Sequence, residues 1–205
     1  MRALVTLALL LAGAASAGAH HVGVYTPRDN EITTNFKQIK FSLQARRFEV
    51  ALRFFEQGAL RAAMRQKAGS LPPGLEAGTR AALHAQDALE VERRLMIFFA
   101  ALTRELAIEA DHRLADPTLS PPARAETGQR FLEAMWRYYN LVDFAVSSRD
   151  SKTSTAVRLA FDEAEGDAKA TSASEADRLR QPLRRIAQIL SNLIDTSSPS
   201  PRRDS

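Results

Sequence analysis

The fold is decided by one long stretch, residues 87–114, which reads DALEVERRLMIFFAALTRELAIEADHRL. Its apolar residues recur at steps of three and four, which is the period of an α-helix with one buried face. The apolar stripe consists of Val91, Leu95, Phe98, Leu102 and Leu106, and it is widened by Met96 and Phe99. Asp87, followed by Glu90 three residues later, is typical of a capped helix N-terminus. The stretch therefore predicts one long helix with a wide apolar face.

Helical periodicity continues on both sides of this stretch. Breaks are expected at Arg46-Arg47, at Gly58 and in the Pro-rich segment 70–74. No segment alternates apolar and polar residues with a period of two, as a half-buried strand would. We therefore predict an all-α chain, a helical bundle of five to seven helices. The predicted helical ranges are 32–43, 48–64 with a break at 58, 75–84, 88–114, 121–146, 155–165 and 175–194.

The N-terminal residues have the layout of a secretory signal peptide. A positive start at Met1-Arg2 precedes an apolar run at 3–12 that is too short to span a bilayer, and two A-x-A patterns follow at 15–19. We expect cleavage after Ala17 or Ala19 and export, to the periplasm. The expected organisation is a signal peptide at 1–19, an extended leader at 20–31, a single helical domain at 32–195 and a disordered tail at 196–205.

Composition limits the classes of function. The chain has no cysteine, so disulfides, Cys-based metal or redox sites and a covalent haem are excluded. The net charge is +4, but most basic residues alternate with acids, and an excess of arginine occurs only in the last predicted helix and the tail. That excess fits either a solvated helix face or contact with an anionic partner. Export and the spread of charge argue against nucleic acid, and no later stretch predicts a transmembrane segment in the mature chain.

Residues 44–56, QARRFEVALRFFE, resemble the middle of a tetratricopeptide hairpin. In that family a small residue closes the first helix, and an aromatic residue followed by an Ala-Leu pair opens the second. Here these positions are Ala45, Phe48, Ala51 and Leu52. The resemblance implies a helix-turn-helix, and no second copy occurs at the 34-residue period of the family.

Cleavage would expose histidine at the N-terminus. A cut after Ala17 leaves Gly-Ala-His, whose α-amine, two amides and His20 imidazole offer the square-planar nitrogen set that Cu(II) favours. This arrangement resembles the amino-terminal copper and nickel site of serum albumins. A cut after Ala19 makes His20 the first residue, which resembles the histidine brace of secreted copper oxygenases and copper-resistance proteins. His20 and His21 are therefore the first predicted metal ligands, with copper as the expected ion.

A second candidate metal site lies at the end of the long helix. Glu105, Glu109 and His112 are spaced i, i+4, i+7, so they share one helix face with the apolar stripe. Glu109 and His112 also have the E-x-x-H spacing of di-iron bundle proteins, which carry two such motifs and two further Glu. A single motif predicts at most a mononuclear site, with iron as the next candidate, alone or shared with the N-terminal histidines. The alternative is a solvated helix end whose acids pair with Arg104 or Arg113.

One acid interrupts an apolar stripe in the predicted helix at 121–146. Asp143 follows Leu132, Trp136 and Tyr139 at helical steps, so a buried carboxylate there would need an arginine or a tyrosine hydroxyl as partner. A structural ion pair is favoured over a pocket acid. The chain has no nucleophile-elbow, phosphate-loop or H-E-x-x-H motif, so we predict that it is not an enzyme, and a carboxylate hydrolase is the weakest hypothesis.

Two functional hypotheses follow. The first is an exported helical protein that binds or handles a metal ion, copper before iron, in the cell envelope. The alternative is a cofactor-free helical adaptor that binds an envelope protein partner, as the hairpin and the Arg-rich last helix indicate.

Overall fold

The computed structural model describes residues 28–168 and 178–198. Within these ranges the chain has eight helices and no strand, which confirms the all-α class. The expected number of five to seven is too low, because the break at Gly58 separates two helices where we expected one element. The helices are α1 Glu31–Gln44, α2 Phe48–Gln57, α3 Ala59–Gln66, α4 Leu75–His84, α5 Ala88–Leu114, α6 Pro121–Arg149, α7 Ser151–Ala168 and α9 Arg180–Ser197.

The junction between α6 and α7 is tighter than predicted. We expected one helix to end at residue 146 and the next to begin at 155, but α6 continues to Arg149 and α7 begins at Ser151. Only Asp150 separates them, and its carboxylate accepts two backbone N–H groups from the first turn of α7, at 3.0 and 3.2 Å. The same residue therefore ends one helix and caps the next.

The last helix extends further than predicted. α9 runs to Ser197, past the expected tail boundary at residue 195. Pro182 lies in its first turn, where the missing N–H costs no intrahelical hydrogen bond. The proline therefore lies at a position where a helix tolerates it.

Parts of the prediction fall outside the described residues. These are the signal peptide, the leader up to residue 27 and the tail from residue 199. Among the helices that the structure does describe, none combines the length and the apolarity needed to cross a bilayer, in line with the sequence.

Two helical hairpins with the same turn form the first half of the described chain. Three residues join α1 to α2 and also α4 to α5, and in each turn the middle residue is left-handed: Arg46 with φ 55° and Gln86 with φ 56°. The N–H of the next residue, Arg47 or Asp87, binds the carbonyl five positions earlier, at 2.8 and 3.0 Å. This is the hydrogen bond of a Schellman motif. The hairpin therefore recurs after 40 residues, which is longer than the 34-residue period of the tetratricopeptide family.

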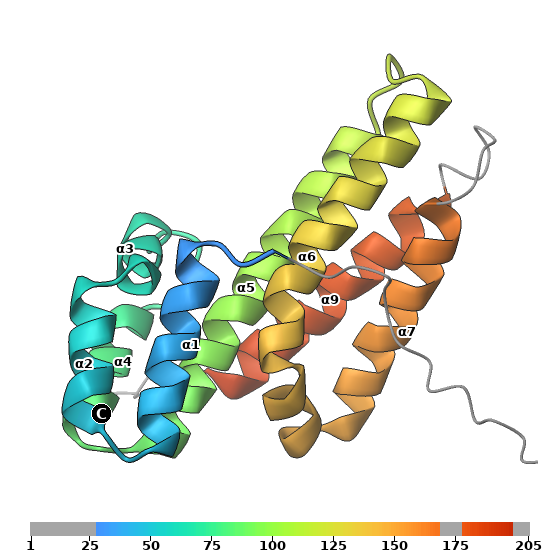
Figure 1. Cartoon of the computed structure of the whole chain (residues 1–205). Coiled ribbons are helices and arrows are strands. Elements are labelled where there is room, and N and C mark those ends of the chain that lie inside the picture. Colours follow the sequence, from blue (N-terminus) through green and yellow to red (C-terminus); the bar gives the residue numbers. More distant parts are fainter. Residues whose placement is uncertain (1–27, 169–177, 199–205) are drawn as a thin grey trace, which may run out of the picture.

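α5 is the central helix of the molecule. It packs against α4, α6 and α9, and every residue from 95 to 103 is buried. A helix covered on all sides must be apolar all round, which the run MIFFAAL at 96–102 supplies. In Figure 1, α1–α4 lie to the left of α5, and α6 and α7 lie to its right.

Aromatic rings fix α1 against α5 and α6. The Phe36 and Phe99 rings meet edge to face with their centroids 4.8 Å apart, and the Tyr138 ring lies 5.9 Å from Phe99. The Tyr138 hydroxyl also accepts a hydrogen bond from Asn30 Nδ2 at 2.9 Å, and Asn30 is the N-cap of α1. These contacts make α1, α5 and α6 one packed unit, which positions the groove described next.

Candidate functional site

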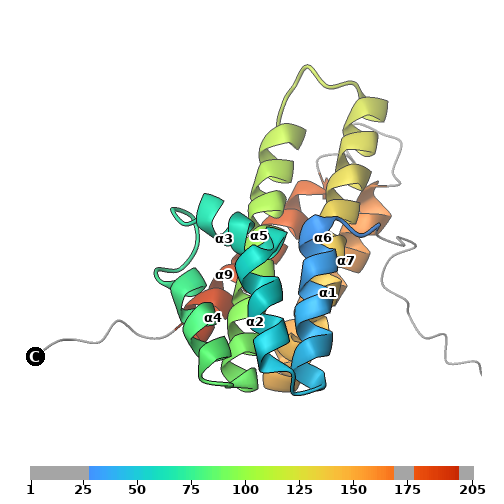
Figure 2. The ribbon, with the colours of Figure 1, turned by 60° about the vertical axis from the view of Figure 1, so that its left-hand side comes forward.

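An open groove of about 330 Å³ lies where the end of α1, the first turns of α5 and the end of α6 meet. These three ends come together at the bottom of the molecule in both Figure 1 and Figure 2. We call it the three-helix groove. Its lining includes Lys40 from α1, Leu89, Glu92 and Arg93 from α5, and Phe144 and Arg149 from α6.

Two large apolar side chains on this groove face water. Leu89 is 80% exposed and Phe144 is 77% exposed. Each lies two residues from a buried valine of its own helix, Val91 or Val142, and so points about 200° away from that helix's core face. Single exposed apolar residues are ordinary on a protein surface, but here two share one groove with the fully buried Met96. The groove therefore presents a combined apolar lining from two helices.

The charged groups beside these side chains are predominantly basic. Lys40, Arg149 and Glu92 all line the groove, and none forms an ion pair with another residue in the described ranges. The Lys40 ammonium lies 5.8 Å from the centre of the Phe36 ring, which is a cation–π distance. Two cations and one carboxylate are thus left without a charged partner around the apolar lining.

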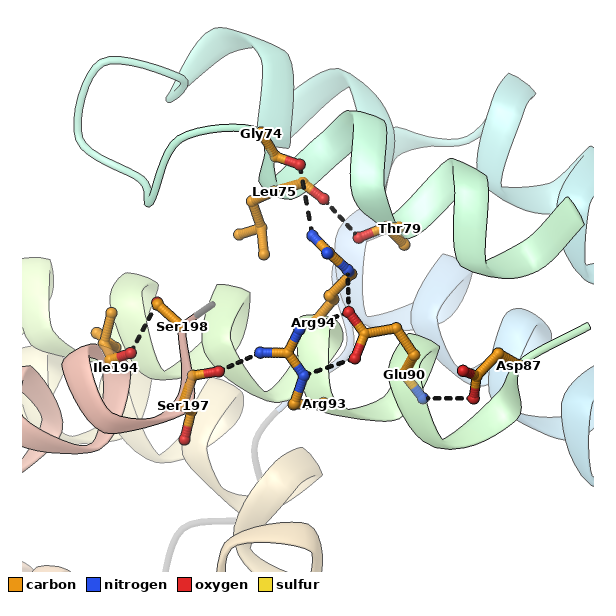
Figure 3. Close-up of polar contacts among 10 residues, drawn as sticks. All are labelled: Gly74, Leu75, Thr79, Asp87, Glu90, Arg93, Arg94, Ile194, Ser197 and Ser198. Atoms are coloured by element: carbon orange, nitrogen blue, oxygen red, sulfur yellow. Dashed lines mark hydrogen bonds and ion pairs between the residues drawn. The ribbon is translucent and has the colours of Figure 1, made fainter. Parts of the chain in front are cut away.

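Arg93, by contrast, is held from two sides. Its guanidinium donates to the Glu90 carboxylate and to the carbonyl of Ser197 at the end of α9, as Figure 3 shows. A cation is favourable there because the last carbonyls of a helix carry partial negative charge. The Arg93 side chain is only 14% exposed. This wall of the groove is therefore fixed, and it joins α5 to α9.

Glu90 extends the network to α4. It also accepts a hydrogen bond from Arg94 Nε at 2.6 Å, and Arg94 reaches the carbonyl of Gly74 at 3.4 Å (Figure 3). A Cβ at Gly78 would lie 2.0 Å from the Arg94 guanidinium, so the missing side chain makes room for that arginine. Asp87 caps the helix by accepting the N–H of Glu90 at 3.0 Å, as the sequence predicted. One carboxylate therefore links three helices beneath the groove.

The network stays charged at physiological pH. The hydrogen bond from Arg93 lowers the pKa of Glu90, although partial burial opposes the change. The same hydrogen bond raises the pKa of Arg93. Because both pKa values move away from neutrality, the pair does not titrate between pH 6 and 8.

Glu105, one of the predicted metal ligands, is engaged in a structural contact. Its carboxylate accepts hydrogen bonds from Lys67 Nζ at 2.6 Å and from Ser70 Oγ at 2.5 Å, while Arg104 binds the Ser70 carbonyl at 3.2 Å. Burial acts to raise the pKa of Glu105, but the hydrogen bonds from Lys67 and Ser70 outweigh it and the pKa is lowered. Glu105 thereby ties the segment after α3 to α5.

The other predicted ligands are not gathered by the described structure. Glu109 is 54% exposed and its nearest charged partner is Arg113, at 3.6 Å. His112 is exposed as well, and His20 and His21 lie outside the described residues. In residues 28–168 and 178–198 no three His, Asp or Glu side chains form a group that could hold a metal ion. Glu109 and His112 are exposed where α5 projects beyond α1–α4 (Figures 1 and 2), while Ala110 and Leu114 keep this part of the helix packed.

Asp143 is a structural ion pair, as predicted. Its carboxylate accepts hydrogen bonds from Arg158 Nε at 3.0 Å and from Ser154 Oγ at 2.9 Å, which joins α6 to α7. The Tyr139 hydroxyl is buried beside this pair, and burial together with the charge of Asp143 raises the Tyr139 pKa. A buried carboxylate with two donors is satisfied without a ligand.

The arginines of the last helix are also committed to other helices. Arg180 and Arg184 both donate to Asp111 of α5, at 2.7 and 2.9 Å, and Arg185 donates to Glu163 of α7 at 2.6 Å. These contacts use the local excess of positive charge for packing α9. Because these arginines pair with acids of the same chain, they no longer favour the prediction that the last helix binds an anionic partner.

A second groove, of about 510 Å³, lies between α1 and α2, and the polar side chains in its lining include Asn35. Its central residue, Asn35, donates to the Phe54 carbonyl at 2.9 Å and accepts the Leu60 N–H at 3.1 Å. Those two backbone groups belong to the break between α2 and α3, so Asn35 is occupied in holding the fold. We therefore take the three-helix groove as the candidate site.

A comparison with protein-family models, curated proteins and solved structures found no match to this chain. The assignment of the candidate site therefore depends on the geometry of this structure alone. Reasoning from sequence missed Leu89 and Phe144, although a signal for both exists. Each is a large apolar residue two positions out of phase with a helical stripe, which predicts an exposed apolar side chain when the stripe is buried.

Proposed function

We propose that this chain is an exported, cofactor-free helical module that binds a protein partner through the three-helix groove. The observation that carries the proposal is the pair of exposed apolar side chains, Leu89 and Phe144, brought to one groove from two helices. Large apolar side chains that are exposed together in one groove are typical of interaction sites. The wall at Arg93 is already ordered, so binding there requires little rearrangement of the protein.

Site-specific photocrosslinking in cells tests this function. A photoreactive phenylalanine analogue at position 144 should give a discrete crosslinked partner, and the purified partner should bind wild type but bind Phe144→Ala at least tenfold more weakly. Leu159 of α7, 61% exposed, is the matched control position. The same crosslinks from 159 as from 144, or none from 144, would contradict the proposal. The mature N-terminus, read by mass spectrometry, tests export.

Copper binding at His20 and His21 is the second candidate function. The supporting observation is in the sequence: both predicted cleavage sites leave an N-terminal amine near His20. Isothermal titration of the processed protein with Cu(II) should show one tight site that is lost in His20→Ala. Affinity no higher than that of an unrelated peptide with one histidine would end this proposal. Glu109→Gln and His112→Ala test in the same titration whether the end of α5 contributes.

A further inference from the structure

We infer that the occupant of the three-helix groove is an amphipathic helix of a partner protein, with two or three apolar residues on one face and acidic residues beside them. This inference rests on the proposed function and specifies the partner's chemistry. It draws on the exposed apolar pair and on the unpaired cations Lys40 and Arg149.

The groove favours recognition by side chains. Its three walls are helices, which present no open strand edge, so a partner cannot add to it as a β-strand. A helix can place apolar residues at i, i+3 and i+4 between Leu89 and Phe144 in the way that helices of this protein pack on one another. This mode needs no change in the backbone of the groove.

Charge selects an acidic helix. Lys40 and Arg149 have no ion-pair partner among the described residues, whereas Arg93 is neutralised by Glu90. The opposing carboxylate is Glu92 alone. Carboxylates on the partner would therefore gain two attractive contacts against one repulsive contact, which steers association and suppresses basic partners.

Two occupants from this chain itself fit less well. A second copy docked face to face would bring together four cations, Lys40 and Arg149 of both grooves, against two carboxylates, Glu92 of each. Ser197, whose carbonyl binds Arg93, is followed closely in the sequence by residues 199–205, PSPRRDS, which include no large apolar residue and contain Arg202 and Arg203. Neither supplies an apolar face on which carboxylates outnumber cations.

The test uses the full processed chain and three synthetic helical peptides that share one Leu/Phe face. Their flanking positions are all Glu, all Gln or all Lys, and binding is measured by fluorescence anisotropy at low and physiological salt. We expect the Glu peptide to bind about tenfold more tightly than the Lys peptide, with a difference that shrinks as salt rises.

Substitutions of the charged residues on the rim should change peptide affinity in opposite directions. Lys40→Glu with Arg149→Glu should reverse the order of the Glu and Lys peptides, and Glu92→Gln should tighten the Glu peptide about two- to fivefold. Phe144→Ala should weaken every peptide about tenfold, whereas Leu159→Ala should weaken none. Circular dichroism and urea unfolding of each variant show that the fold is kept.

The outcomes separate the two proposals. If the three peptides bind equally and Phe144→Ala weakens them all, the groove is a docking site but the acidic preference is wrong. If no peptide binds while photocrosslinking from position 144 identifies a partner, the function stands and the helical occupant is wrong. If no peptide binds and positions 144 and 159 crosslink alike, both proposals are overturned.

Discussion

Gly58 decides how α2 and α3 meet, because it leaves room for a buried amide. A Cβ at this position would lie 2.1 Å from Asn35 Oδ1, and that amide is held by Phe54 and Leu60. The backbone of Gly58 is extended, with φ −97°, so any residue could adopt its conformation. Space, and not backbone freedom, therefore requires glycine here.

Gly58→Ala should lower the free energy of unfolding by about 1–3 kcal/mol, since Asn35 must move and lose a buried hydrogen bond. Urea unfolding measures the effect. Gly166→Ala in α7 is the matched control, because nothing lies within 4 Å of a Cβ there. That control should gain about 0.5–1 kcal/mol from helix propensity. Similar effects of the two substitutions would contradict the steric argument.

Asp111 is a second residue whose contacts have a measurable consequence. Burial acts to raise its pKa, but the hydrogen bonds from Arg184 and Arg180 outweigh burial, so the folded-state pKa is lowered. A carboxylate with a lowered pKa stabilises the fold fully above its unfolded pKa of about 3.9. That contribution is lost as the pH falls through the folded-state value.

Asp111→Asn should therefore destabilise the protein at neutral pH and also flatten the loss of stability below about pH 4. Urea unfolding from pH 7 down to pH 3 gives both quantities. Glu109→Gln, which removes an exposed carboxylate from the same helix, is the control and should change the stability at neutral pH much less than Asp111→Asn. A slope for Asp111→Asn equal to that of wild type would show that the arginine pairs do not stabilise the fold.

At the scale of elements, the recurring hairpin is the main feature that the sequence did not predict. Its two copies share little beyond the turn, where Leu43 and Ala45 correspond to Leu83 and Ala85. Burial matches more widely, and the equivalent buried pairs are Ile39 with Thr79, Leu43 with Leu83, Ala51 with Val91 and Phe55 with Leu95. Side-chain volumes differ at each pair except one, so similar residues do not mark the repeat, and its 40-residue spacing also lies outside the 34-residue period of the tetratricopeptide family.

The two turns predict the same response to glycine. Arg46 and Gln86 both have a left-handed backbone, which costs a residue with a Cβ about 1 kcal/mol relative to glycine. Arg46→Gly and Gln86→Gly should each raise the free energy of unfolding by about 0.5–1 kcal/mol.

Arg47→Gly is the control for this experiment, because the φ of Arg47 is −94° and glycine relieves no strain there. It should be neutral or destabilising, since glycine also adds freedom to the unfolded chain. Stabilisation by Arg47→Gly as large as that by Arg46→Gly would mean that the left-handed turn is not the cause.

At the scale of the whole molecule, α5 joins the two halves of the core. It contacts α4, α6 and α9, and Phe99 touches aromatic rings of both α1 and α6. Neither half can keep its core covered once this helix leaves. Unfolding should therefore be one cooperative transition.

The single tryptophan provides the test of that cooperativity. Trp136 lies in α6 and packs against Phe161 of α7 with ring centroids 5.2 Å apart, so its fluorescence reports the C-terminal half. Urea midpoints from Trp136 fluorescence and from far-UV circular dichroism should coincide. Ala51→Gly, a core change in α2, should shift both midpoints equally. Separate midpoints would show that the hairpins unfold on their own.

The all-α class, the long helix at 88–114, the breaks at Arg46-Arg47 and Gly58 and the pairing of Asp143 could all be read from the sequence. Each depends on a local pattern: apolar spacing, a capping residue, a helix breaker, or an acid on an apolar stripe. Such patterns act within a few residues, so the sequence displays them directly.

Only the tertiary structure decided which exposed residues share a surface and which charges are already paired. Leu89 and Phe144 line one groove because α5 and α6 pack side by side. Glu105 forms an ion pair with Lys67 because the segment after α3 folds back onto α5. Both results depend on contacts between residues that are far apart in the chain. Periodicity along one helix carries no information about which helix will face it.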